Sequence, residues 1–415
     1  MHLLLLSLAL CAGAIQVPLG LQSPGACLWR PPPPQLSCGL TELDEPRISL
    51  TVTEKPKIQR RPVSRWQGPH GCVGEFCLFV NPGFANGRGI VAITTKQTIE
   101  NLKANLKEKS STAAPANPAT PSFTVTSIKN KGLGLVANTT LHRGDTIMTQ
   151  TPAILVHRNF LERLPPTKQH ALLDDAIARL PAPLRASFLA QMGHVEAGHK
   201  ITAILATNTF QMNLGGPDGH HYGNFPEVSR FNHDCRPNAA FHIAADRDSS
   251  LTHTTTAVRA IQPGEELTIS YLGALEPRAA RQLRAHHAWG FDCACAQCRL
   301  PSAAAAASDA RLGEIADIET ELADVRSERV TPAMLRRLAG LYEVERLEGS
   351  VASAYTLIAL NSNMLGEEEM AREFAARAVE ALVIENGSGS GDEDAMRALA
   401  ERPREHFTWR RRVVG

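Results

Sequence analysis

Three closely spaced cysteines in the last third of the chain constrain its fold more than any other feature. Cys293, Cys295 and Cys298 lie within six residues, a spacing that suits the thiolate ligands of a structural zinc ion. The alternatives are local disulfides or reduced, buried thiols, but a Cys-x-Cys pair has poor geometry for a disulfide. Because structural zinc takes four ligands, the pattern predicts a fourth ligand from elsewhere in the chain.

A second motif stands about sixty residues earlier. Residues 231–239 read Phe-Asn-His-Asp-Cys-Arg-Pro-Asn-Ala, which joins an Asn-His pair, a lone cysteine and a Pro-Asn turn. Residues 264–271 follow as Gly-Glu-Glu-Leu-Thr-Ile-Ser-Tyr, and residues 290–293 as Gly-Phe-Asp-Cys. A lone Asn-His pair is often a turn with a hydrogen-bonded histidine, but this ordered set is far more specific.

These elements together resemble a SET domain followed by a post-SET zinc loop, similar to the SMYD-like and fungal SET proteins. The match covers about residues 123–300. It implies an α+β fold, in which a SET-type β-fold with a helical insert and a post-SET zinc loop precedes an all-α, TPR-like C-terminal domain. One departure is clear: residues 157–230 contain no cysteine, so the MYND zinc finger of the SMYD group is missing.

The resemblance implies methyl transfer from S-adenosylmethionine to a lysine amine of a histone or non-histone protein. The matching tyrosine, Tyr271, would orient the amine and the methyl group. The cofactor would be held by residues from five segments, namely Lys131, Gly132, Leu133, Gly134, Asn208, Asn232, His233, Tyr271 and Phe291. The alternative is a catalytically inactive SET-fold binding or scaffold protein. A pure scaffold has no need for the asparagine, the histidine and the tyrosine together, which favours catalysis.

The resemblance also supplies the missing zinc ligand. Cys235 would join Cys293, Cys295 and Cys298 around one Zn²⁺, which would attach the post-SET loop to the Asn-His motif. Phe210 and Trp289 would line the substrate lysine channel. The tryptophan stands where the SMYD group often has a tyrosine, so the degree of methylation stays open.

Two Gly-x-Gly segments compete for the cofactor turn. Lys131 to Leu135 has strand-like residues on both sides, and Arg143-Gly144-Asp145 follows at the distance that a hairpin needs. Glycines in such a turn let the backbone approach a ligand closely. We therefore assign this copy to the cofactor and interpret Gly87-Arg88-Gly89 as structural or as a decayed duplicate.

Composition divides the chain into seven segments. They are predicted to be a signal peptide (1–14), a disordered Pro-rich region (15–65), a small Cys-containing unit (66–101), a linker (102–122), the SET domain (123–273), the post-SET zinc region (274–300) and a helical TPR-like domain (301–415).

The first residues resemble a secretory leader. Leu3 to Leu6 and the small residues Ala12 to Ala14 fit one, although no Lys or Arg precedes them. Cys72 and Cys77 are close enough to bridge across a turn. These features favour the secretory pathway or the extracellular space, and the nucleus or cytoplasm is the alternative.

Charge is nearly balanced, at +1 by formal count. We therefore expect no direct contact with nucleic acid. No membrane span is expected either. The expected partners are a protein substrate with a target lysine and a protein docked on the C-terminal helices.

Residue patterns place the secondary structure as follows. Strands are expected near residues 145–148, 153–156, 240–244, 254–257 and 266–271, and helices over 167–180, 183–191 and 200–207. The alanines 303–307 are interpreted as a joint between domains. Thr331-Pro332 predicts a helix start, and two later helices are expected to end near Gly366 and Gly387. The His220-His221-Tyr222 segment is interpreted as a solvated turn, and His286-His287 as part of an exposed helix.

Overall fold

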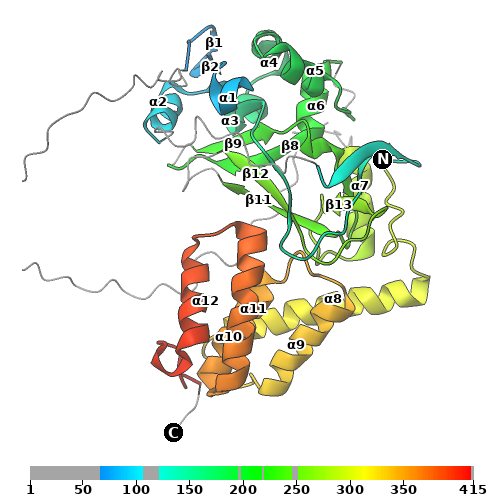
Figure 1. Cartoon of the computed structure of the whole chain (residues 1–415), viewed down its shortest axis with the longest axis vertical. Helices are drawn as coiled ribbons and strands as arrows, with labels where there is room; N and C mark the ends of the chain where they lie inside the picture. The colour runs from blue at the N-terminus through cyan, green and yellow to red at the C-terminus, as the bar shows by residue number, and fades with distance from the viewer. Residues whose placement is uncertain (1–65, 106–120, 195–197, 217–218, 245–250, 413–415) are drawn as a thin grey trace, which may run out of the picture.

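The computed structural model describes residues 66–105, 121–194, 198–216, 219–244 and 251–412. The predicted signal peptide, the Pro-rich region and most of the predicted linker lie outside the described residues. The described chain has a β-rich part and a helical part, stacked end to end (Figure 1). The predicted α+β class, with a cysteine cluster followed by helices, is confirmed.

A six-stranded sheet lies at the end of the molecule away from the helical part. Its strands, in spatial order, are β1 (Cys72–Val73), β2 (Phe76–Asn81), β3 (Ile90–Thr94), β7 (Ile154–His157), β9 (His220–Asn224) and β8 (Thr209–Asn213). Strand β3 pairs in parallel with β7. Residues 66–101, which we expected to form a small unit of their own, therefore share a sheet with strands more than fifty residues further along.

Short helices surround this sheet. They are α1 (Phe84–Gly87), α2 (Lys96–Asn105), α3 (Arg158–Arg163), α4 (Pro166–Ala178), α5 (Ala182–Leu189) and α6 (Lys200–Asn208). The last three lie within two residues of the predicted spans. The first of them begins one residue before the predicted start at Thr167: Pro165 is the N-cap and Pro166 opens the helix, because a proline at the first helical position loses no hydrogen bond.

Two further sheets carry the central motifs. One contains, in spatial order, β10 (Asn232–His233), β13 (Glu266–Ile269), β5 (Gly132–Ala137) and β4 (Phe123–Ile128); the other contains β11 (Ala239–Ala244), β12 (Thr252–Ala257) and β6 (Thr146–Gln150). Strand β10 runs parallel to β13, with His233 opposite Ile269. This pairing brings the Asn-His motif beside the strand that leads to Tyr271.

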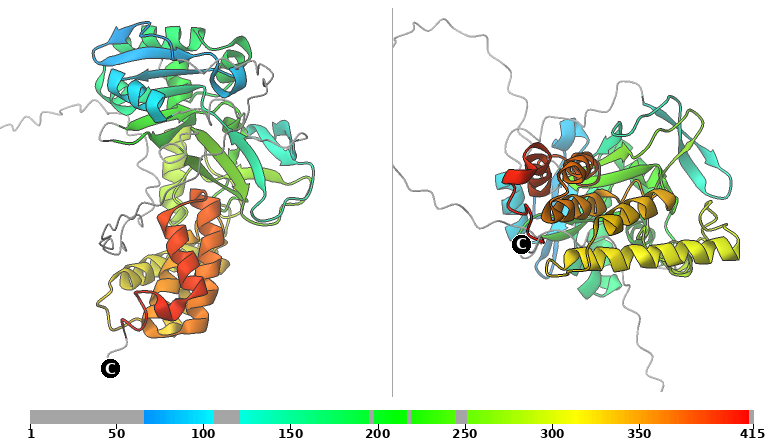
Figure 2. Two further views of the ribbon diagram at one scale, coloured as in Figure 1. Left: turned by 60° about the vertical axis from the view of Figure 1, so that its left-hand side comes forward. Right: turned by 90° about the horizontal axis from the view of Figure 1, so that it is seen from below.

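The rest of the chain is helical. Helix α7 (Arg278–Trp289) precedes the cysteine loop, and then follow α8 (Ser302–Ala323), α9 (Pro332–Val344), α10 (Ala352–Leu365), α11 (Glu368–Asn386) and α12 (Gly391–Glu401). Helices α10, α11 and α12 lie side by side (Figure 2). Within the described residues, no helix has both the length and the apolar character needed to span a membrane.

Helix ends in this region follow local sequence rules. The Thr331 hydroxyl accepts a hydrogen bond from the Met334 amide at 3.3 Å, as expected of an N-cap. Gly366 ends α10 in the left-handed conformation, with φ of +81°. The interpretation of alanines 303–307 as a joint is wrong: they form the first turns of α8, since alanine has the highest helix propensity.

Two early features have structural roles. Cys72 and Cys77 form a disulfide between the paired strands β1 and β2. Gly89 has φ of +83°, and a Cβ atom there would lie 2.8 Å from the Pro181 ring. The second Gly-x-Gly copy therefore allows the backbone to pass close to the start of α5.

The interpretation of residues 220–222 as a solvated turn is wrong for two of the three. His221 and Tyr222 are buried in β9, between β7 and β8. The His221 ring bonds to the Thr94 hydroxyl at 2.8 Å and to the Gly219 carbonyl at 2.9 Å. His286 and His287 are exposed on α7, as expected.

A buried histidine in this core makes stability depend on pH. His253 is fully buried on β12, stacked on Phe241 with ring centroids 4.7 Å apart. Burial lowers its pKa from 6.5 to about 3, so between these pH values the unfolded chain binds a proton that the folded chain does not. The free energy of unfolding should then fall with decreasing pH, by at most about 1.4 kcal/mol per pH unit from this residue.

We predict that His253→Phe makes this pH dependence shallower, because phenylalanine fills the same stack and does not titrate. The measurement is urea unfolding at pH 7.5, 6.5 and 5.5. His287→Phe, a change at an exposed position, is the control and should keep the wild-type slope. Equal slopes for all three proteins would show that His253 does not contribute.

Candidate functional site

His233 links the two central motifs. Its Nδ1 accepts a hydrogen bond from the Tyr271 amide at 3.1 Å, so the ring proton must be on Nε2. That nitrogen lies 3.3 Å from the Cys235 Sγ atom and donates to it. Burial lowers the pKa of His233 to about 4, which keeps the ring neutral at physiological pH. The imidazole therefore connects the tyrosine backbone to a cysteine thiol.

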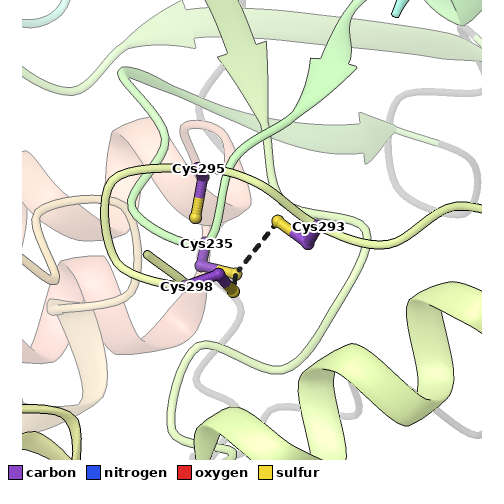
Figure 3. A group of neighbouring side chains, drawn as sticks. All are labelled: Cys235, Cys293, Cys295 and Cys298. Carbon is purple, nitrogen blue, oxygen red and sulfur yellow. Dashed lines mark hydrogen bonds between the residues drawn. The ribbon is translucent and has the colours of Figure 1, made fainter. Parts of the chain in front are cut away.

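Four cysteines meet beside this histidine (Figure 3). Their sulfur atoms, from Cys235, Cys293, Cys295 and Cys298, all lie within 4.8 Å of one another, and all four residues are buried. The Cys235 sulfur is 3.5 Å from that of Cys298 and 3.9 Å from that of Cys293.

These distances fit a metal site better than disulfides. Sulfur atoms around a tetrahedral zinc ion, at about 2.3 Å from the metal, stand about 3.8 Å apart. A disulfide would need about 2.05 Å, and all four thiols are free. The cluster therefore has the ligand type, number and spacing that suit zinc, and its fourth thiol comes from the Asn-His motif.

Tyr271 lies against the same cluster. Its hydroxyl donates to the Phe231 carbonyl oxygen at 2.6 Å. Its ring centroid is 5.4 Å from that of Trp289 and 6.4 Å from that of Phe291. Burial, with a smaller effect of Glu266, raises the pKa of Tyr271 above its usual value. The phenol stays protonated, and its oxygen keeps lone pairs that can accept a hydrogen bond.

The Gly-rich segment 131–134 lies next to Asn232. Only Lys131 is in the turn after β4, whereas Gly132, Leu133 and Gly134 begin strand β5. A Cβ atom on Gly134 would stand 2.7 Å from the Asn232 side-chain nitrogen. That nitrogen donates to Glu266 at 2.9 Å and, more weakly, to the Leu133 carbonyl at 3.4 Å. The 131–134 segment predicted to bind the cofactor is therefore in contact with the Asn-His motif, and a larger residue at Gly134 would displace the Asn232 side chain.

Two residues in this group were not predicted from the sequence. Glu266 accepts from Asn232 and pairs with the Lys131 ammonium at 2.6 Å. Asn238 donates to the Glu266 carbonyl and accepts from the Thr268 amide, both at 2.9 Å. Both residues belong to motifs that are visible in the sequence. Each is a polar residue whose side chain faces the neighbouring strand, and this position was the signal that could have identified it.

The other predicted residues lie at different distances from this group. Phe291 stacks near His233, with ring centroids 5.9 Å apart. Trp289 donates from its indole nitrogen to the Thr207 carbonyl at 3.1 Å. This bond joins the end of α6 to Trp289, whose ring lies beside that of Tyr271. Asn208, next to it, uses its side-chain nitrogen locally, on the Met192 and Ile204 carbonyls.

Phe210 lies in the aromatic core. Its neighbours are Phe241, Phe225 and His253, with ring centroids 5.1, 5.9 and 4.7 Å away. Among the ring contacts of the described residues, Phe210 has none with Tyr271 or Trp289.

Comparison with known proteins agrees with this geometry. Residues 132–272 match the family described as SET domain. This chain is a SET domain protein, related to the SET5 and SMYD methyltransferases. The matched residues include Gly132 and Gly134, the Asn-His motif and Tyr271, and they end before the three clustered cysteines.

Three relatives show how far the similarity extends. The histone-lysine N-methyltransferase set5 of Schizosaccharomyces pombe is 25% identical over 288 residues, which are 68% of this chain and 85% of that protein. The potential protein lysine methyltransferase SET6 of Saccharomyces cerevisiae is 37% identical over 19% of this chain and 20% of its own. The N-lysine methyltransferase SMYD2 of Homo sapiens is 24% identical over 40% of this chain and 36% of its own.

We predict that Cys295→Ser lowers zinc content and thermal stability together. The substitution removes one of four thiolates, and a structural zinc ion contributes folding free energy. Metal analysis of the purified protein and a thermal unfolding curve measure both effects. Wild-type zinc stoichiometry in the variant would exclude the cluster as the metal site.

We predict that Asn232→Ala weakens cofactor binding about tenfold, because the loss of one hydrogen bond to a polar ligand costs about 1.4 kcal/mol. Calorimetric titration with S-adenosylmethionine measures the affinity. The exposed Asn138, whose amide bonds to the Pro121 carbonyl, provides the matched control Asn138→Ala. Equal affinities in both variants would remove Asn232 from the cofactor site.

Proposed function

We propose that this SET domain protein is an S-adenosylmethionine-dependent protein-lysine N-methyltransferase. The observation that carries the proposal is the chain of contacts from the Gly-rich segment 131–134 through Asn232 and His233 to Tyr271 and the cysteine cluster. A fold kept only as a scaffold needs neither a neutral, oriented histidine nor a phenol with free lone pairs.

The cofactor supplies, when bound, a methyl group activated by a sulfonium. Asn232, His233 and the 131–134 segment would hold it, and the Phe291 ring would form an apolar wall beside it. Glu266 would orient Asn232 and Lys131 through the contacts already described. The four cysteines, with zinc, would keep the loop that carries Phe291 closed against the Asn-His motif.

The substrate side must deliver a neutral amine. A lysine ammonium with a pKa near 10.4 has little free amine at neutral pH. An apolar channel, which Tyr271 and Trp289 would form, disfavours the charged form and lowers that pKa. The Tyr271 oxygen would accept a hydrogen bond from the amine, since the phenol proton already bonds to the Phe231 carbonyl. Positioning of this kind supplies much of the rate enhancement.

The target protein and the degree of methylation stay open within this proposal. Trp289 stands where related enzymes often have a tyrosine, and its indole nitrogen is engaged by the Thr207 carbonyl. Peptides from histones and from non-histone proteins can be tested together on one array with a labelled methyl donor. Labelled lysine spots support the proposal.

We predict that Tyr271→Phe lowers kcat/KM at least about tenfold, equivalent to about 1.4 kcal/mol of transition-state stabilisation. The ring and its packing stay, and only the oxygen is lost, so affinity for S-adenosylmethionine should not change. Steady-state methylation of a peptide found on the array, with calorimetry alongside, measures both quantities. Full activity in this variant contradicts the assigned role of Tyr271.

The competing function is a catalytically inactive SET-fold binding protein. Folded, zinc-loaded protein that binds no S-adenosylmethionine and labels no peptide would support that function. If the protein binds S-adenosylmethionine but methylates no peptide on the array, the catalytic proposal is rejected for those substrates, while the assignment of the SET fold stands.

A further inference from the structure

A buried ion pair joins the SET domain to the helical region. The Arg236 Nη2 atom lies 2.9 Å from the Glu345 Oε2 atom, and each side chain is only 1% exposed. Arg236 directly follows Cys235 in the chain, and Glu345 directly follows α9. Residues more than one hundred positions apart are thus joined inside the molecule, next to the cysteine cluster.

Arg236 holds the chain around the first cysteine. Its Nη1 atom donates to the Cys235 carbonyl at 2.8 Å and to the Ala274 carbonyl at 3.1 Å. Its Nε atom donates to the Glu345 carbonyl at 2.5 Å. One guanidinium therefore fixes the backbone of a predicted zinc ligand, the segment after Tyr271 and the end of α9.

Glu345 reaches the second cysteine segment as well. Its Oε2 atom accepts from the Ser308 hydroxyl at 2.7 Å and lies 3.3 Å from the side-chain nitrogen of Gln297, which stands directly before Cys298. Its Oε1 atom accepts from Arg311 at 2.7 Å. Burial alone would raise the pKa of Glu345, but the bonds from Ser308, Arg236 and Arg311 outweigh it and hold the pKa below its usual value.

This ion pair acts on the position of its neighbours more than on bulk stability. A buried ion pair gains little over an apolar pair of the same size, because desolvation offsets the attraction. Its specific effect is geometric, since every bond of the pair has a required direction. Here the bonds of the pair reach the Cys235 carbonyl and the side chain of Gln297, the residue before Cys298. Loss of a polar group that holds a metal ligand in place typically lowers the metal affinity about 10- to 100-fold.

We propose that Glu345, through Arg236 and Gln297, is a positioning residue for the four-cysteine metal site, so that the helical region contributes directly to zinc retention. The site then depends on residues outside the SET domain. This inference concerns the metal site and stands apart from the methyltransferase proposal.

The test is zinc release from the full-length protein to a chromogenic chelator at pH 7.5. Glu345→Gln keeps the size of the side chain but removes the charge. The matched control is Glu314→Gln. Glu314 also receives two arginine bonds, both 2.7 Å, from Arg337 on α9, but this pair lies on the surface of the same helices. We expect about tenfold faster release or more from Glu345→Gln and wild-type release from the control.

A second variant separates positioning from folding. Arg236→Met combined with Glu345→Leu removes both fully buried charges at once. Arg311 also loses its partner, but its side chain is 31% exposed and can reach water, so the protein should fold with near wild-type thermal stability. If the inference holds, this double variant is stable and still releases zinc faster than the control.

Two outcomes overturn the inference. Release from Glu345→Gln and from the stable double variant at the wild-type rate would reduce the pair to an ordinary structural contact. A wild-type protein without zinc would remove the metal site itself. Neither result depends on whether any peptide is methylated.

Discussion

The convergence of four thiols on one point holds the functional region together. Cys235 comes from the loop after β10, and the other three come from the loop after α7. The two loops are separated by three strands and a helix in the sequence, and neither has much secondary structure of its own. A metal ion bound by both would contribute folding free energy where the core contributes little. It would also fix His233, and through it Tyr271, in one orientation.

The helical region completes this arrangement from outside. Arg236 and Glu345 join the cysteine loops to the end of α9, and a second contact, Arg143 with Glu380 at 2.7 Å, joins the turn before β6 to α11. The helical region is therefore in direct contact with the residues beside the cysteine cluster. Its packing bears on the geometry of the site, which gives a physical reason for the SET domain and the helices to occur in one chain.

Sequence motifs and the resemblance that they carry predicted the fold class and the grouping of the four cysteines, and the signals behind them are local. The cysteine spacing, the Asn-His motif and Thr331-Pro332 each act within a few residues, so their consequences are visible in the chain. The burial of His221 was missed because it depends on strands paired from both sides. The place of residues 66–101 was missed because β3 pairs with a strand beyond the linker. Arg236 was visible, but its partner lies 109 residues away.

Zinc-edge X-ray absorption of the purified full-length protein tests the central claim most directly. The account predicts one zinc per chain with four sulfur neighbours at about 2.3 Å. A coordination shell with nitrogen or oxygen in place of sulfur, or a folded protein without zinc, would contradict it.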